Sequence, residues 1–357
     1  MFKNLLLAFS ILSGCFAQTG PTYAEKLGWK KGDRVLILHM DDAGMSHDSN
    51  MGIEQVLENG AARSLSVMMP TPWVPEIVHY IKKHPGTDAG LHLTLTSEWQ
   101  EYRWGPLSGA PAVPGLVDSE GAMWSSVAAV VTHAKADEVD REMRAQLDRA
   151  ERMGFHPTHL DTHMGTVYAS PEFLARYVQL GIEKQIPVMI PGGHDTYIQA
   201  DRQASRIAAL KKSGEYREGM ALPDDPTLAP VRALAVKLWD AGLPVLDDLH
   251  NTSYDWKIPA GIAADDERLR QWRTQRYMET LSELKPGLTM VIMHCTAPGD
   301  TFVHISSSGP IRKADMLAML DPKFQAFLKE QGFIVTTWSE ALERRKRGQY
   351  THSPISQ

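Results

Sequence analysis

Residue types that bind metal ions or move protons gather in four short segments of the sequence. The first is His39-Met40-Asp41-Asp42-Ala43-Gly44, which follows an apolar run and supplies two adjacent carboxylates. Successive side chains of a regular strand point to opposite faces, so Asp41 and Asp42 can both reach one cavity only where the strand ends. That geometry favours one carboxylate as a metal ligand and the other as a free base. An Asp-Asp pair on its own is more often an ordinary solvated turn.

The second and third segments place histidines on strand faces. His92 lies in the alternating stretch 91–96, whose leucines share the face opposite to the histidine. Alone, this histidine is more typical of a hydrogen-bonded core residue. His159, Asp161 and His163 are spaced i, i+2 and i+4, which predicts one shared strand face. Three ionisable side chains on a buried face are costly unless they bind a metal ion or each other.

The fourth segment begins at His294, directly after the apolar run 289–293. An imidazole at a strand end can donate a proton near neutral pH. In a parallel α/β barrel the active site lies at the C-terminal ends of the strands, where all four segments are expected. Two histidines and one carboxylate with open positions make a hydrolytic site for zinc or a similar divalent ion.

The elements that must position these residues alternate along the chain. Regular alternation of strands and helices predicts a parallel sheet with right-handed crossovers, and seven strands favour an incomplete barrel over an open sheet. No G-x-G-x-x-G opens any unit, which argues against a dinucleotide fold. The predicted strands are 35–38, 65–69, 89–95, 158–163, 188–190, 288–293 and 333–337. The predicted helices are 50–58, 74–83, 137–153, 171–183, 227–240, 266–284 and 313–331.

Two long stretches, 97–124 and 192–226, interrupt the alternation and are expected as loops that form lids or walls. Aromatic side chains in the first can stack on sugar rings, although loop aromatics more often hold a lid to the body. Those aromatic residues are Trp99, Tyr102, Trp104 and Trp124. Four further polar residues are expected to be ordinary members of loops or strand ends, namely Asp195, Asp247, Asp248 and His250.

Composition excludes several classes of protein. The chain has 357 residues with 43 acidic and 37 basic side chains, a formal net charge of −6, which argues against a nucleic-acid partner. A hydrophobic share of 43% with 22% charged residues is typical of a globular protein. The two cysteines, Cys15 and Cys295, leave no internal disulfide once the N-terminal segment is processed.

The N-terminal residues 1–17 are typical of an export signal, with Lys3 before a short apolar run. Two cleavage sites remain open: an A-x-A-like site at 15–17, and a lipobox at 12–15 that would leave a lipid on Cys15. We therefore expect an exported, periplasmic or extracellular protein, attached to a membrane only through that lipid. The predicted organisation is a signal at 1–17, a tether at 18–33, one domain at 34–346 and a tail at 347–357.

The four segments, in this order, resemble the motifs of the YdjC-like carbohydrate deacetylases, which include chitooligosaccharide deacetylase and hopanoid-associated members. The family's N-A-D-D-F-G resembles residues 39–44, and its G-x-H-x-x-L-T resembles residues 90–96. Its T-H-x-D-S-H resembles residues 158–163, and its late C-H-P resembles residues 293–295. The resemblance extends from about Val35 to about Ala341. The chain departs from these motifs where Ala43 replaces Phe and Cys295 replaces Pro.

This resemblance implies an α/β fold, an irregular (β/α) barrel that is TIM-like and polysaccharide-deacetylase-like, with long loop insertions. It implies that Asp42, His92 and His163 bind one divalent metal ion, Mg²⁺ or Zn²⁺. His159 and Asp161 are then expected to orient the ligands, because a carboxylate beside a metal-bound imidazole fixes its direction.

The reaction implied is hydrolysis of an N-acetyl group on an amino sugar of an acetylated oligosaccharide or glycoconjugate. Asp41 would be the catalytic base and His294 the acid that protonates the leaving amine. Three alternatives stay open: a metal-dependent esterase or other hydrolase with the same ligands, a non-catalytic glycan-binding lipoprotein, and a glycosidase that works without a metal. The oligomeric state also stays open, with a dimer among the options.

Overall fold

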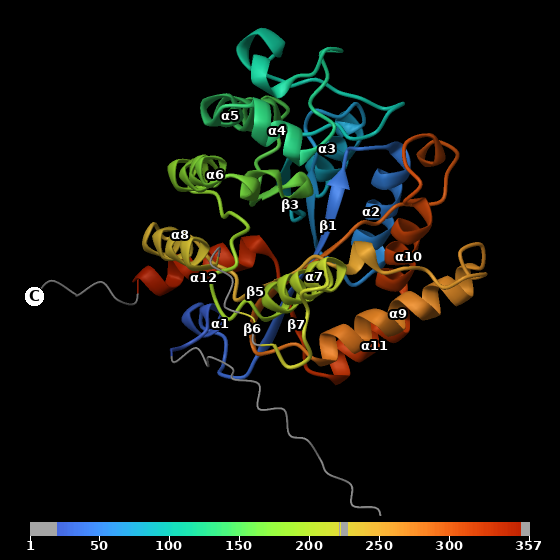
Figure 1. Ribbon diagram of the computed structural model, residues 1–357. Coiled ribbons are helices and arrows are strands. Elements are labelled where there is room, and N and C mark those ends of the chain that lie inside the picture. The colour runs from blue at the N-terminus through green and yellow to red at the C-terminus, as the bar shows by residue number, and fades with distance from the viewer. Residues whose placement is uncertain (1–19, 221, 223–227, 351–357) are drawn as a thin grey trace, which may run out of the picture.

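The protein is built around a curled sheet of seven parallel strands. The computed structural model describes residues 20–220, 222 and 228–350 (Figure 1). Six strands follow the order β4-β3-β2-β1-β6-β5, and β7 pairs with the start of β1. The strands are β1 (Arg34–Ala43), β2 (Ser64–Val67), β3 (Asp88–Leu93), β4 (Leu160–Thr162), β5 (Asp248–His250), β6 (Gly287–Met293) and β7 (Ile334–Val335).

The sheet curls into an irregular barrel, which confirms the predicted fold class. Parallel bridges join Leu160 to Val188 and Pro191 to Leu246, so residues 188–191 lie between β4 and β5. The sequence predicts a strand at 188–190, and the structure has only these isolated bridges there. The barrel is therefore least regular at this point, where residues 189 and 191 line the cavity described below.

Helices surround the strands, as Figure 1 shows, with α5 and α6 on one side and α9 to α11 on another. Several begin at a polar cap; Ser46, for example, accepts a hydrogen bond from the backbone N–H of Ser49. The helices are α1 (Tyr23–Lys26), α2 (His47–Asn59), α3 (Val74–Lys83), α4 (Val127–His133), α5 (Ala136–Arg152), α6 (Pro171–Lys184), α7 (Thr196–Ser213), α8 (Leu228–Asp240), α9 (Asp266–Ser282), α10 (Gly309–Leu320), α11 (Pro322–Glu330) and α12 (Trp338–Tyr350). In the described part of the chain, no helix has the length and apolar character that crossing a membrane requires.

The apolar faces of strands and helices meet as the alternation predicts. Leu91, Leu93 and Leu95 are fully buried in the main hydrophobic core, together with Val139 and Met143 of α5. His92 points the other way, toward the interior of the barrel, where the polar network described below begins. The leucine face of β3 thus fixes the direction of this histidine.

Other elements also differ from the sequence prediction, which does not include α1, α4 and α12. The single helix predicted at 313–331 is two helices, because Asp321 caps α11 and Pro322 cannot continue α10. The second long loop contains α7, whose residues are all at least partly exposed, so no apolar period marks it in the sequence. Strand β5 is only three residues long and carries the polar residues Asp248 and His250, so its sequence resembles that of a loop.

The segment predicted as a tether packs against the barrel over its described part. Tyr23, Ala24, Leu27 and Trp29 are buried. The Asp247 carboxylate accepts hydrogen bonds from the backbone N–H groups of Tyr23 (2.8 Å) and Ala24 (2.9 Å). At the other end of the chain, helix α12 runs past the predicted domain end at residue 346. The predicted export signal lies outside the described residues.

Candidate active site

An irregularity in β1 turns two consecutive carboxylates into one cavity. The register against β2 shifts between Met40 and Ala43, and Asp42 has a φ of 64°, in the left-handed region. Few residues other than glycine tolerate this conformation, and aspartate is among them. Asp41 and Asp42 therefore both line the cavity although they are neighbours in one strand.

Three buried side chains converge above the end of β1. Oδ1 of Asp42 lies 3.3 Å from Nε2 of His92 and 3.3 Å from Nδ1 of His163, and the two nitrogens are also 3.3 Å apart. Ligand atoms about 2.1 Å from an ion, at angles of about 90–110°, are separated by roughly 3.0–3.4 Å. Oδ1 of Asp42 is buried and has no hydrogen-bond partner among the described residues. The donor set and its spacing therefore fit a divalent metal ion.

Each imidazole of this trio is held from behind by a carboxylate. Nδ1 of His92 lies 2.9 Å from Oδ1 of Asp161, and Nε2 of His163 lies 2.8 Å from Oε1 of Glu98. Such hydrogen bonds fix which nitrogen faces a metal ion and raise the basicity of the ligand. Burial alone would lower the pKa of His163, but Glu98 and Asp42 together raise it to about 9.

The second oxygen of Asp42 is bound by a buried arginine. Nη1 of Arg312, from α10, lies 2.6 Å from Oδ2 of Asp42. Burial alone would raise the pKa of this carboxyl, but Arg312 and the two imidazoles hold it well below its ordinary value. Oδ1 is left facing His92 and His163. Arg312 thus orients the carboxylate by its other oxygen.

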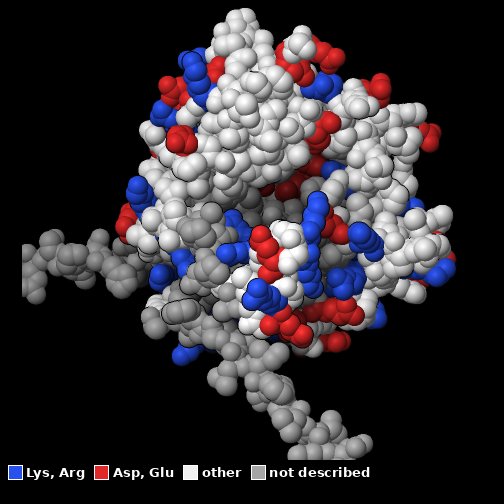
Figure 2. All heavy atoms as spheres, viewed as in Figure 1, with Lys and Arg blue, Asp and Glu red and all other residues white. Residues whose placement is uncertain are grey.

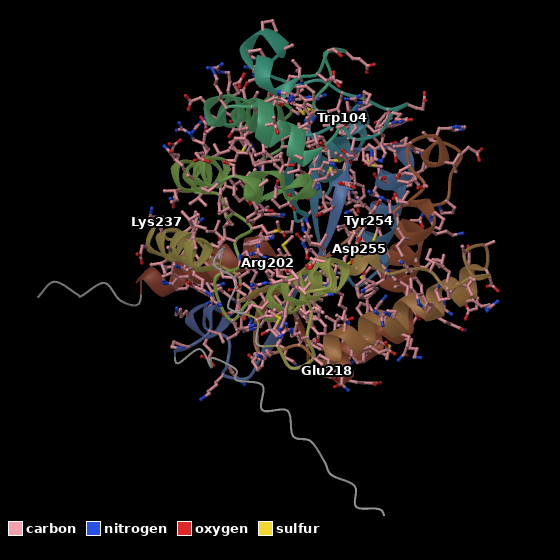
Figure 3. The ribbon with its side chains drawn as sticks, viewed as in Figure 1. Trp104, Arg202, Glu218, Lys237, Tyr254 and Asp255 are labelled. Carbon is pink, nitrogen blue, oxygen red and sulfur yellow. The ribbon has the colours of Figure 1, made fainter. Side chains whose placement is uncertain are left out.

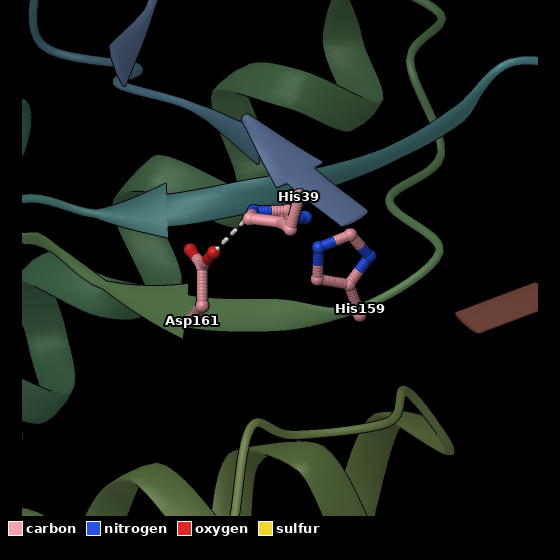
Figure 4. Close-up of side chains that lie close together, drawn as sticks. All are labelled: His39, His159 and Asp161. Carbon is pink, nitrogen blue, oxygen red and sulfur yellow. Dashed lines mark ion pairs between the residues drawn. The ribbon is translucent and has the colours of Figure 1, made fainter. Parts of the chain in front are cut away.

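Asp41 lies beside this trio without joining it. Its Oδ2 is 3.8 Å from Nε2 of His92, and its Oδ1 is 3.1 Å from Nε2 of His39. Nε2 of His39 also lies 2.8 Å from Oδ2 of Asp161 (Figure 4). Burial would lower the pKa of His39, but the two carboxylates raise it to about 9. The result is a buried cation between Asp41 and Asp161.

His159 belongs to the same cluster but does not contact the trio. Its ring packs edge-on against His39 (4.9 Å between centroids) and stacks on Trp338 (5.4 Å). A Cβ at residue 90 would lie 2.4 Å from Nε2 of His159, so the ring needs the glycine there. Burial and the nearby His39 lower the pKa of His159 to about 4. The structure therefore places Asp161 in contact with His92 of the trio, whereas His159 contacts His39.

His294 lies across the site at the end of β6. Its Nε2 is 3.9 Å from Oδ2 of Asp42, and its backbone N–H donates to Oδ2 of Asp315 at 3.0 Å. Burial, reinforced by the positive charge of Arg312, lowers the pKa of His294 to about 4. The imidazole is therefore neutral at pH 7 in the metal-free protein.

These residues form one end of a cavity of about 740 Å³. Figure 2 shows a hollow near the centre of the viewed face, with acidic side chains at its depth. Of the four loop aromatics, only Trp99 lines the cavity, with its ring centroid 6.2 Å from that of His163. Trp104 is buried in an apolar cluster, and the Trp124 indole N–H donates to the carbonyl of Gly115. Trp104, and Tyr102 through a hydrogen bond from its hydroxyl to the carbonyl of Met45, therefore hold the loop to the body, whereas the Trp124 bond stays within the loop.

The polar residues expected to be structural do have structural partners. The Asp248 carboxylate accepts a hydrogen bond from the backbone N–H of Tyr197 at the start of α7. Asp195 pairs with Arg232 of α8 at 3.0 Å. His250 lies 3.3 Å from the hydroxyl of Thr252. None of these side chains lines the cavity, which favours the prediction that they are ordinary members of loops or strand ends.

Comparison with known proteins agrees with the motifs. The model of the family described as YdjC-like protein matches residues 35–330. The chain belongs to this family. A carbohydrate deacetylase of Thermus thermophilus is 29% identical over 324 residues, or 89% of this chain and 97% of that protein. A carbohydrate deacetylase of Brevibacillus brevis is 33% identical over 253 residues, or 70% of this chain and 92% of that protein.

One solved structure shares the fold of this YdjC-like protein. It is the crystal structure of a candidate cellobiose-phosphate cleavage protein from Enterococcus faecalis V583, with a TM-score of 0.63 at 17% sequence identity. The similarity covers 86% of this chain and 98% of that one. At this identity the comparison speaks for the fold alone.

Two residues of the site are not indicated by the sequence analysis. Glu98 continues the two-residue spacing that starts at His92, so extending that pattern beyond residue 96 could have found it. Arg312 lies in a helix, 18 positions after His294, and no pattern in the sequence marks it. Both residues place a charged group beside the trio, and neither lies in the four segments of the sequence analysis.

Proposed function

We propose that this protein is a metal-dependent hydrolase that removes the N-acetyl group from an amino sugar of a carbohydrate. The observation that carries the proposal is the triangle of Asp42, His92 and His163, whose facing atoms are 3.3 Å apart. The Asp41 carboxylate lies beside this triangle without being part of it. The names of the similar proteins in Thermus thermophilus and Brevibacillus brevis supply the substrate class.

In this proposal the trio holds one divalent ion through Oδ1 of Asp42, Nε2 of His92 and Nδ1 of His163. The two imidazoles favour zinc, and open coordination positions suit hydrolysis. When bound, such an ion supplies Lewis acidity toward a carbonyl oxygen and lowers the pKa of water. Glu98 and Asp161 keep the two imidazoles in the tautomers that leave these nitrogens free.

Asp41 is the proposed general base. It lines the cavity, lies within 3.8 Å of a proposed ligand nitrogen and is not bound by Arg312, which contacts the other aspartate. His39 contacts Oδ1 of Asp41, which leaves Oδ2 on the side of the trio. In this proposal Oδ2 takes the proton of the attacking water. His39 thereby keeps the basic oxygen turned toward the site.

His294 is the proposed proton donor to the leaving nitrogen, since an amine anion is too poor a leaving group. With a pKa of about 4, the neutral imidazole has no extra proton to give at pH 7. It can act as the acid only after a proton reaches it, and Asp41 is the group that gains one during attack. The two residues are therefore proposed to work in sequence across the cavity.

The proposal is tested by acetate release from N-acetylated chitooligosaccharides, with protein reconstituted with Zn²⁺ or Mg²⁺ and with EDTA added. We expect release that EDTA abolishes and one of these ions restores. No release, with one ion bound per chain, contradicts the substrate class and directs the search to ester substrates. No release and no bound ion contradicts the hydrolase and favours a glycan-binding protein.

A further inference from the structure

The cavity has two chemically different halves. The proposed metal ligands occupy the half formed by β1, β3 and the 3₁₀ helix η3 (His163–Ala169). The facing half is formed by residues 188–191, β5, β6, α7 and α8. Its side chains, with one from the end of η3, form what we call the apolar wall: Tyr168, Met189, Ile198, Val231, Leu249 and Ile292.

The apolar wall reaches the proposed metal site from two directions. Ile292 lies in β6 two residues before His294, which directly follows the strand, and both side chains line the cavity. Tyr168 follows His163 by five residues, after a kink at Met164 and Gly165, and also lines the cavity. A group held at the trio would therefore have apolar surface within reach on either side.

Depth separates the apolar wall from the polar lining. Met189, Leu249 and Ile292 are only 4%, 5% and 7% exposed and lie in one hydrophobic cluster. By contrast, Asp201 and Asp255 line the cavity and are exposed to solvent. Figure 3 shows Arg202 and Asp255 near the centre of the same face. The half that faces the proposed ligands is thus exposed and polar at its mouth and buried and apolar at its depth, whereas the half that holds the trio is polar at its depth.

An N-acylated amino sugar has the same division. Its hydroxyl groups need polar partners or water, and its acyl chain is the part that gains from leaving water. With the scissile carbonyl at the trio, the acyl chain can lie along the apolar wall while the sugar stays at the polar mouth. An acetyl group offers one methyl to a wall of six apolar side chains in a cavity of about 740 Å³.

We infer that this site accepts N-acyl groups longer than acetyl, with the chain lying against the apolar wall. This inference rests on the proposed hydrolase function and specifies its substrate class. It follows from the burial and chemistry of the apolar wall, because an acetyl group would bring only one methyl group to these side chains. Each methylene buried on the wall is worth roughly a fourfold gain in binding.

The first test compares N-acetyl-, N-butanoyl- and N-hexanoyl-glucosamine and the matching chitobiose derivatives as substrates, by amine release. We expect kcat/KM to rise at least tenfold from acetyl to butanoyl. Direct binding to the metal-free protein, measured by calorimetry, is expected to strengthen in the same order. The second readout does not depend on turnover, so it separates recognition of the chain from chemistry.

Two valines of α8 provide a matched pair of variants. Val231 lines the cavity, whereas Val236 is 52% exposed and does not. The substitution Val231→Thr keeps the shape and adds a hydroxyl, so we expect it to lower the hexanoyl-to-acetyl ratio of kcat/KM at least threefold. Val236→Thr makes the same change outside the cavity and is expected to leave that ratio unchanged.

The outcomes separate the inference from the proposed function. Activity on acetyl substrates with a steep loss for butanoyl overturns the inference and leaves the deacetylase proposal intact. No activity on any chain length, with metal bound, contradicts the proposed function itself. A gain for octyl N-acetylglucosaminide without a gain for N-hexanoyl substrates also overturns the inference, because the wall would then hold an aglycone.

Discussion

Nε2 of His163 lies 2.8 Å from Oε1 of Glu98, which leaves Nδ1 of the same ring facing Oδ1 of Asp42 at 3.3 Å. The hydrogen bond to Glu98 selects the tautomer that a metal ion requires. We expect Glu98→Gln to weaken metal binding about 10- to 100-fold, the usual effect of losing such a carboxylate. Calorimetric titration with Zn²⁺ measures this directly.

Glu101 offers the matched control for Glu98. It lies three residues further along the same loop and is exposed to solvent. Glu101→Gln removes the same charge from the same loop and is expected to leave the affinity within about twofold. Equal weakening by both variants would mean that loop charge, and not the hydrogen bond to His163, sets the affinity.

Asp41 is expected to matter for turnover but not for metal binding. Asp41→Asn keeps the shape of the side chain and removes its ability to take a proton, so kcat should fall by about 10²–10⁴-fold. Asp42→Asn removes the central carboxylate of the trio, so it should abolish metal binding as well. Metal content and acetate release, measured on both variants, distinguish the two roles. Substantial activity in Asp41→Asn would exclude it as the base.

The sequence predicts the fold class and which site residues lie together better than it predicts the bounds of the helices and strands. The four segments at strand ends suffice to bring Asp42, His92 and His163 together, because strands of a parallel barrel end at the same rim. The sequence also predicts the inward face of His92, since its leucine neighbours need the core. Both predictions rest on local patterns, because side chains alternate between the two faces of a strand with a fixed period of two.

What the sequence cannot give are the contacts made by residues far apart or by irregular backbone. The register shift that turns Asp41 and Asp42 into one cavity depends on pairing with β2, about 25 residues later. Arg312 reaches Asp42 across 270 positions of the chain. Helix α7 has no buried residue, so its sequence lacks the apolar period that would predict a helix.

His294 is predicted to matter most where the leaving group needs a proton. For an N-acetyl sugar the departing nitrogen must be protonated, so His294→Ala should lower kcat about 10²-fold or more. For p-nitrophenyl acetate the departing phenolate is stable without a proton, so the same variant should lose less than about tenfold. Steady-state rates on both substrates test this difference. Equal losses on the two substrates would assign His294 to a role before bond cleavage.

The buried cation at His39 predicts how stability depends on pH. Its pKa is about 9 in the folded protein and near 6.5 when exposed, because it pairs with Asp161 and Asp41. A raised pKa gives stability that is fully present below about pH 6.5 and is lost as the pH rises toward about 9. The shift corresponds to a loss of about 3 kcal/mol. His39→Asn, the residue that the family motif has here, keeps a hydrogen-bond donor without the titration. Denaturant unfolding with saturating metal should therefore show a loss between pH 6.5 and 9 in the wild type that this variant lacks. Parallel pH profiles for the two proteins would show that His39 is neutral in the folded state.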